Sequence, residues 1–145
     1  MNFLDKLRPF TLLVLRCTLG LIFLFHGYPK IAHGIGGTVK YVTSLGLPSP
    51  TILSYILVGL ELGGGALLIL GLATRPIALM FTVEMCVALW KVHLVNGIMD
   101  VHEYEFPLLV LAAALALASV GPGALSLDYS FFGGGSSKPK ARPKS

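Results

Sequence analysis

Four long apolar runs constrain the fold of this chain more than any other feature of its sequence. They lie at about residues 9–28, 49–72, 76–95 and 105–120. A helix needs about 20 mostly apolar residues to cross a bilayer. Each run is continuously apolar rather than alternating, and in lipid only helices and closed barrels satisfy the backbone. The sequence therefore predicts an all-α integral membrane four-helix bundle, formed by residues 1–131.

The composition supports a membrane location. Charged residues make up 12% of the 145 residues and hydrophobic residues 54%, whereas soluble domains carry about 25% charged residues. A soluble domain of this size could not bury so much apolar surface. Residues 132–145 differ, because after Phe132 they consist of Gly, Ser, Pro, Ala and four basic residues, which predicts a disordered basic tail. Most of the net charge of +4 lies in this tail, so it gives no reason to expect a nucleic acid partner.

The basic residues beside the apolar runs predict the orientation in the membrane. Basic residues are in excess on the cytoplasmic side of membrane proteins. One predicted side holds seven of them and the other holds two. The seven are Lys6, Arg8, Arg75, Lys138, Lys140, Arg142 and Lys144, and the two are Lys30 and Lys40. We therefore expect a multi-pass protein of the plasma membrane with both termini in the cytoplasm.

Charged residues inside the apolar runs are the first candidates for a functional site. They are Arg16, Glu61, Glu84 and Lys91. A charge at the bilayer centre costs about 2.5–3.5 kcal/mol, so such residues usually have a function. Arg16, Glu61 and Glu84 lie at comparable depths, and Lys91 shares a helix face with Glu84. The sequence predicts that the four form a buried catalytic cluster, with an ion-paired cluster that only holds the helices together as the alternative.

A second set of candidates lies toward the opposite, outer side. His26, His93 and Glu105 could bind a ligand there. The histidines lack the HxxxH or HExxH spacing of metal sites, so no metal ligand is predicted. Cys17 and Cys86 form no CxxC pair, and a redox role for them has no support from a motif.

Glycines in the second run indicate close contacts between helices. Gly64 and Gly65 follow Glu61 by three and four residues, which leaves space beside the carboxylate or lets another backbone approach. Gly59 and Gly63 form a small-xxx-small pair, a weak signal for helix packing in membranes.

Several short segments, taken in order, resemble the DoxX family of small membrane proteins. The similarity covers residues 8–128, and its last segment is the most specific. The segments are Leu15-Arg16 to Phe23, Phe25-His26-Gly27 with Lys30, Gly46-Leu47-Pro48, Glu61-Leu62-Gly63-Gly64, Leu70-Gly71-Leu72-Ala73-Thr74-Arg75, His93 with Gly97, and Gly121-Pro122-Gly123-Ala124-Leu125-Ser126-Leu127-Asp128.

The resemblance implies a four-helix plasma-membrane protein of a family usually described as oxidoreductases and associated with quinone-linked sulfur oxidation and with oxidative stress. It leads to the hypothesis of an oxidoreductase component that binds a quinone or a similar lipophilic redox carrier in the buried polar site. The electrons would come from a redox partner protein. The alternatives are a non-catalytic membrane scaffold or assembly factor, and a small-molecule transporter that would need a homo-oligomer.

Overall fold

The computed structural model describes residues 3–93 and 101–133, and this part of the chain is entirely helical. Two of the segments are π-helical turns, labelled η. In chain order the elements are α1 (Phe3–Ala32), α2 (Gly36–Ser44), α3 (Pro50–Gly59), η1 (Leu60–Gly64), α4 (Gly65–Leu70), α5 (Thr74–Ala88), η2 (Leu89–His93), α6 (Val101–Val120) and α7 (Leu127–Phe132).

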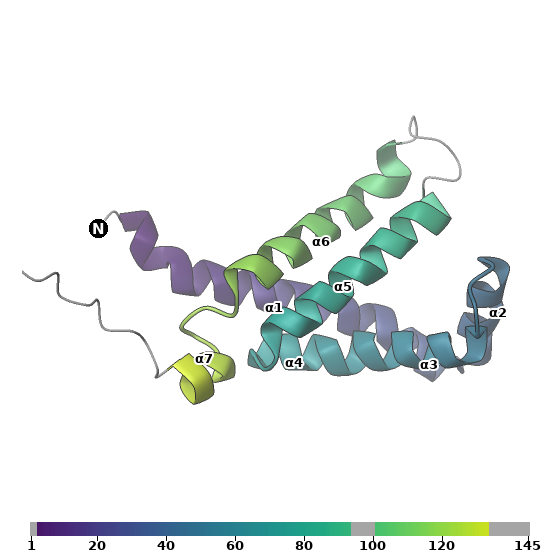
Figure 1. The fold of residues 1–145 in the computed structure, drawn as a ribbon, viewed down its shortest axis with the longest axis horizontal. Coiled ribbons are helices and arrows are strands. Elements are labelled where there is room, and N and C mark those ends of the chain that lie inside the picture. The colour runs from purple at the N-terminus through teal and green to yellow at the C-terminus, as the bar shows by residue number, and fades with distance from the viewer. Residues whose placement is uncertain (1–2, 94–100, 134–145) are drawn as a thin grey trace, which may run out of the picture.

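The helices form two arms that meet at one end and diverge at the other (Figure 1). One arm consists of α1 packed against α3, η1 and α4, and the other consists of α5 packed against α6. The arms join where α5 contacts α4 and η1, and where α6 contacts α1. The end that carries α2 is called the α2 end here, and the end that carries the start of α1 and α7 is called the α7 end.

Three helices are long and apolar enough to cross a membrane, at Asp5–Ala32, Pro50–Leu70 and His102–Val120. The fourth predicted span corresponds to α5 with η2, so a four-helix crossing stays a prediction, as does the cytoplasmic position of both termini. Residues 134–145 of the predicted tail lie outside the described residues.

The helix boundaries differ from the predicted runs at several points. The first helix begins at Phe3 and ends at Ala32, so Pro9 and Pro29 both lie inside it. It therefore carries Lys30 in its last turn, a residue that the apolar run had left outside the helix. The segment between the first two runs contains the short helix α2. The helix α7 begins at Leu127, within the last two residues of the closing motif, and was not predicted.

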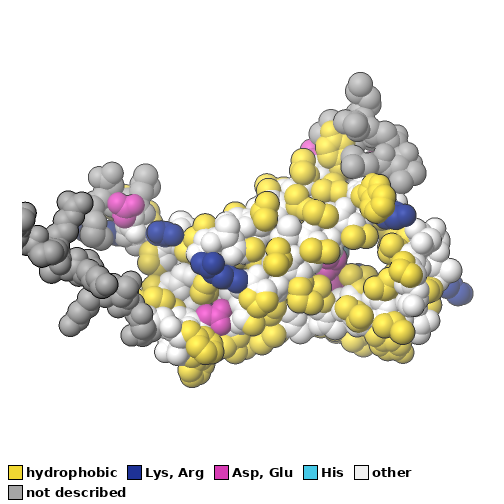
Figure 2. Space-filling view, in the orientation of Figure 1, with side chains coloured by type: hydrophobic (Ala, Val, Ile, Leu, Met, Phe, Trp, Pro, Cys, Tyr) yellow, Lys and Arg dark blue, Asp and Glu magenta, His cyan; other side chains and the backbone are white. Residues whose placement is uncertain are grey.

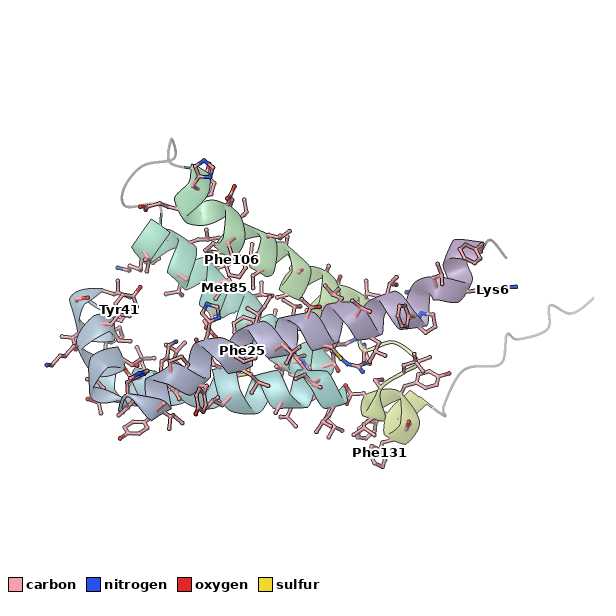
Figure 3. The ribbon with its side chains drawn as sticks, turned by 180° about the vertical axis from the view of Figure 1, so that it is seen from behind. Lys6, Phe25, Tyr41, Met85, Phe106 and Phe131 are labelled. Carbon is pink, nitrogen blue, oxygen red and sulfur yellow. The ribbon has the colours of Figure 1, made fainter. Side chains whose placement is uncertain are left out.

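The surface of the molecule is largely apolar, as expected of a chain surrounded by lipid. Hydrophobic side chains cover the face shown in Figure 2, while Lys and Arg atoms gather toward the two ends. Large hydrophobic side chains are exposed along every long helix, from Phe10 and Phe25 on α1 to Leu109 on α6. Phe131 on α7, labelled in Figure 3, is also exposed. A surface of this kind would aggregate in water and is stable in a bilayer.

The core lies where the two arms meet. The rings of Phe23 and Phe81 stack with 3.5 Å between their centroids, and both side chains are almost fully buried. Around them the core contains Leu19, Leu68, Ile77, Ala78, Val110, Ala114 and Leu117. This core joins α1, α4, α5 and α6.

A close contact between the backbones of α1 and α4 occurs at Gly20 and Gly65. A Cβ atom on Gly65 would lie 2.7 Å from the carbonyl oxygen of Gly20, and one on Gly20 would lie 2.6 Å from that of Gly65. Small residues permit such approach in membrane proteins. Gly63 differs, because nothing lies within 4 Å of a Cβ added there.

We expect Gly65→Ala to lower the free energy of unfolding by about 1–3 kcal/mol, because the added methyl group forces two backbones apart. Gly63→Ala, two residues earlier in η1, is the matched control. At that position helix propensity alone favours alanine by up to about 1 kcal/mol. Denaturant titration in detergent measures both variants. Equal stability of the two would show that the Gly20–Gly65 contact does not hold the helices.

Candidate functional site

A buried ion pair links the first two long helices. Glu61 lies in η1 and is only 3% exposed. Lys30, in the last turn of α1, points its side chain toward it, and Nζ lies 2.5 Å from Oε1 and 2.7 Å from Oε2. Such a two-point contact of an ammonium with both carboxylate oxygens is a strong, charge-assisted interaction.

Gly27 lets the two helices come close enough for this pair to form. A Cβ on Gly27 would lie 2.9 Å from Cβ of Glu61 and 2.9 Å from Cγ of Leu62. Gly27 is one turn before Lys30, so α1 and η1 are nearly in contact beside the ion pair. Any side chain at this position would displace Glu61.

Glu84 on α5 completes the site from the second arm. Its carboxyl group lies within electrostatic range of the Glu61 carboxylate and of the Lys30 ammonium. Its Oε2 is buried and has no hydrogen-bond partner among the described residues. Two negative charges close together in an apolar surrounding repel each other, so ionisation of both carboxyl groups at once is unfavourable. Lys30, Glu61 and Glu84 together are called the acid–lysine cluster below.

The backbone is irregular where the cluster forms. Glu61 lies in the π-helical turn η1, which interrupts the long helix between α3 and α4. Single π turns inside α-helices occur frequently at functional sites. The second π turn, η2, contains Lys91.

Arg16 does not join this cluster, so the prediction that it meets Glu61 and Glu84 is wrong. Its Nη1 donates to the carbonyl oxygen of Pro122 at 2.7 Å and its Nη2 to that of Leu125 at 2.6 Å. The physical reason is that the loop after α6 turns its carbonyl groups inward, and two of these accept from the buried guanidinium, whose Nε has no partner among the described residues.

The same loop is tied to the second arm by Asp128. Its carboxylate accepts hydrogen bonds at 2.8 Å from the backbone N–H groups of Ala73 and Thr74, at the start of α5. The N–H of Asp128 donates to the carbonyl oxygen of Gly71. The closing motif, residues 121–128, is therefore a clasp that joins α1 to the turn between α4 and α5.

The other predicted residues also lie apart from the cluster. Lys91 was predicted to be part of the cluster, but the cation that contacts a carboxyl group there is Lys30. The Lys91 ammonium instead lies 4.7 Å from the centroid of the Trp90 ring. His26 bonds the carbonyl oxygen of Ile22 through Nδ1, and its ring lies against Phe106 with 6.4 Å between centroids. These two residues therefore have local partners of their own.

Glu105, one of the two outermost candidates, makes its contact away from the cluster. Glu105 is exposed and lies 3.4 Å from His102. The side chain of His93 lies outside the described residues. Within the described ranges, no three His, Cys, Asp or Glu side chains come together as a metal site.

Sequence reasoning missed Lys30, which was counted only among the flanking charges. Two signals could have found it. The apolar character continues through Ile31 and Ala32, which extends the helix beyond Lys30. Gly27, one turn earlier, also leaves space for a long side chain to reach a neighbouring helix.

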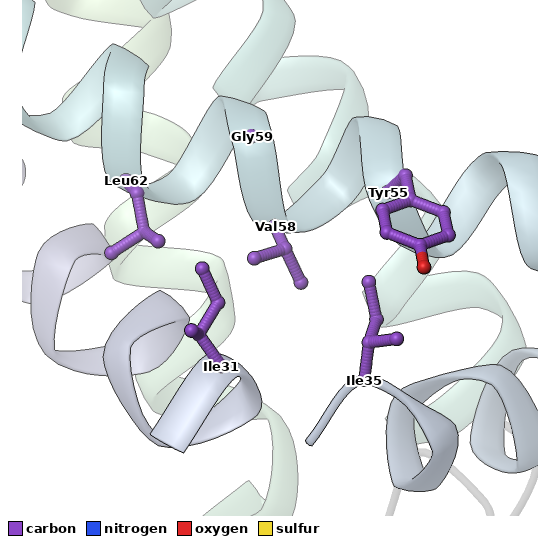
Figure 4. Close-up of a pocket in the computed structure, with 6 residues that line it drawn as sticks. All are labelled: Ile31, Ile35, Tyr55, Val58, Gly59 and Leu62. Atoms are coloured by element: carbon purple, nitrogen blue, oxygen red, sulfur yellow. The ribbon is translucent and has the colours of Figure 1, made fainter. Parts of the chain in front are cut away.

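An apolar groove runs beside the cluster between the two helices of the first arm. It has a volume of about 420 Å³ and is lined by Ile31, Ile35, Tyr55, Val58, Gly59 and Leu62 (Figure 4). Ile31 follows Lys30 in the chain and Leu62 follows Glu61, so the groove occupies the neighbouring face of both helices.

Comparison with known proteins identifies the family. The family model described as DoxX matches residues 11–94, more than half of the chain. The chain belongs to the DoxX family. This DoxX protein is 37% identical to CatD of Bacillus subtilis, named a putative oxidoreductase, over 84% of the chain and 87% of CatD. It is 35% identical to the inner membrane protein YphA of Escherichia coli, over 83% of the chain and 90% of YphA.

A further relative agrees with this placement of the DoxX protein. It is 33% identical to YqjF, an inner membrane protein of Escherichia coli, over 86% of the chain and 95% of YqjF. No solved structure matches the chain. The relatives and the apolar helices together place this protein in the cell membrane, with several crossings.

Proposed function

We propose that this DoxX protein is a component of a membrane oxidoreductase and binds a quinone, or a similar lipophilic redox carrier, at the acid–lysine cluster. The observation that carries the proposal is the arrangement of Glu84 near the Lys30–Glu61 pair, with one buried carboxyl oxygen that has no partner within residues 3–93 and 101–133. Ionisable groups inside membrane proteins usually serve a function, and unpartnered polar atoms there are costly.

The chemistry of the cluster suits such a carrier. Reduction of a quinone to a quinol takes two electrons and two protons. A carboxyl group that holds a proton can donate it to a quinone oxygen, and Lys30 can stabilise the negative charge that develops there. The electrons come from a redox partner protein, because this chain has no recognisable flavin or nicotinamide motif. The name of CatD supports a role in an oxidation–reduction reaction, but it names no carrier.

The groove next to the cluster would hold the apolar part of the carrier. Its walls are hydrocarbon except for the hydroxyl of Tyr55 and the backbone of Gly59. A carrier with a polar ring and an isoprenoid tail could place the ring at Lys30 and Glu61 while the tail lies between Ile31 and Leu62. Pockets that combine apolar walls with a few polar groups are typical of small-molecule sites.

Retention of quinone tests this proposal. We expect mass spectrometry of the protein purified from native membranes to find quinone at close to one per chain. Glu84→Gln should lose it, because an amide N–H is a weaker hydrogen-bond donor to a quinone oxygen than the acidic O–H of a carboxyl group. Glu103→Gln, an exposed acid-to-amide change at the start of α6, is the matched control and should retain it.

The alternative is a scaffold in which the cluster only joins the two arms. The Lys30–Glu61 pair does link α1 to η1, and this contact favours that reading. If well-folded wild-type protein and both variants all lack quinone, the redox-carrier site is rejected and the scaffold role is supported.

A further inference from the structure

We propose that the acid–lysine cluster is open to water from the α2 end of the molecule and sealed from the α7 end, so that its protons are exchanged with one side of the membrane only. The inference rests on the cluster being the functional site, and it holds whichever carrier binds there. It assigns the side of the membrane that supplies or receives protons.

The seal begins one turn from the cluster on the α7 side. Phe81 precedes Glu84 by three residues on α5 and is fully buried. Its ring stacks face to face on Phe23 of α1, with planes 2° apart. The two rings join the two arms one turn from Glu84, and the neighbouring buried hydroxyl of Thr82 already donates to the carbonyl oxygen of Ala78.

The apolar layer continues beyond the rings toward the α7 end. Leu68 and Ala78 have no exposed surface, and Leu19 and Ile77 are 6% exposed or less. From Phe81 to Thr74 the helix α5 rises by about 10 Å, and the buried apolar residues of all four core helices surround this stretch. The clasp of Arg16 with Pro122 and Leu125 then closes the α7 end of the core.

Within the described part of the chain, the opposite side of the cluster is open. The arms diverge toward the α2 end, and Figure 2 shows the surface hollowed between α3 and α5, with acidic side-chain atoms at the base of the hollow. The Lys30 side chain is 28% exposed even though its ammonium group holds Glu61. A membrane-embedded charge that is exposed faces either a partner or water, because lipid contact is too costly.

Two residues on the α2 side of the cluster fit this opening. His26 lies one turn before Lys30 on α1 and is exposed. Its ring lies against that of Phe106 on α6, a residue labelled in Figure 3. Ala88 follows Glu84 by one turn on α5, so only a small side chain stands on this face of the helix. An opening on one side and a buried apolar layer on the other make exchange one-sided.

Cysteine labelling in vesicles of known orientation tests the inference. The full-length protein would carry Cys17→Ser and Cys86→Ser, with one new cysteine at a time. Ala88→Cys probes the approach, and Ala78→Cys is its matched control in the dry layer of the same helix. Lys40→Cys on α2 and Ser130→Cys on α7 are exposed markers that report which side the reagent reaches. The probe is a charged, membrane-impermeant thiol reagent.

We expect the reagent to label Ala88→Cys from the side that labels Lys40→Cys and not from the side that labels Ser130→Cys. Ala78→Cys should stay unlabelled from both sides until the protein is unfolded. Labelling of Ala88→Cys from the α7 side, labelling of folded Ala78→Cys, or no labelling of Ala88→Cys from either side would each overturn the inference. The assay uses no quinone, so its outcome is independent of the retention experiment.

Discussion

Lys30→Met is expected to destabilise the protein by about 3–5 kcal/mol, because removing one partner of a buried ion pair leaves the other without compensation. Methionine keeps the length and apolar stem of lysine and removes the ammonium group that contacts both oxygens of Glu61. The free energy of unfolding, measured by denaturant titration in detergent or bicelles, gives the size of the effect.

Two further variants determine the cause of this loss. Lys40→Met makes the same change on the exposed face of α2 and should leave stability within about 0.5 kcal/mol of wild type, as surface changes usually do. Lys30→Met combined with Glu61→Gln removes the uncompensated charge and should recover much of the stability. If the double variant is no more stable than Lys30→Met, the ion pair is not the reason for the loss.

The double variant also distinguishes a structural role of the Lys30–Glu61 pair from a role in quinone binding. A double variant that folds well but retains no quinone would support the redox-carrier proposal. A double variant that folds well and still retains quinone would show that Lys30 and Glu61 only hold the helices together.

Arg16→Gln is expected to weaken the fold by about 3–6 kcal/mol, since it removes two hydrogen bonds from a charged donor, each contributing about 1.5–3 kcal/mol. Arg16 is 1% exposed, and its hydrogen bonds to Pro122 and Leu125 hold the clasp on α1. The loss should appear both in the free energy of unfolding and as faster proteolysis of the closing motif.

Arg16→Lys should restore only part of this stability. A lysine ammonium is a single point charge and cannot reproduce the fork of the guanidinium group on two separate carbonyl oxygens. Arg8→Gln, on the exposed start of α1, is the matched control and should behave like wild type. Arg16→Gln protein with wild-type stability would show that the clasp is held by Asp128 alone.

The apolar runs by themselves determined that this chain is helical and belongs in a membrane. Backbone groups in lipid must be satisfied within the segment, so a long apolar run has few alternatives to a helix. For the same reason, Glu61 and Glu84 could be selected from the sequence as candidate site residues, because any charge inside such a run is costly and needs a partner.

The partners themselves depended on the tertiary structure. Arg16 pairs with carbonyl groups more than 100 residues away, and no local pattern indicates how the loop after α6 turns back onto α1. Lys30 joins Glu61 because α1 extends past it and because Gly27 allows η1 to approach. The sequence shows which side chains need a partner in a membrane. The crossing of the helices decides which of these side chains meet, because the distance between two helices depends on packing between segments distant in the chain.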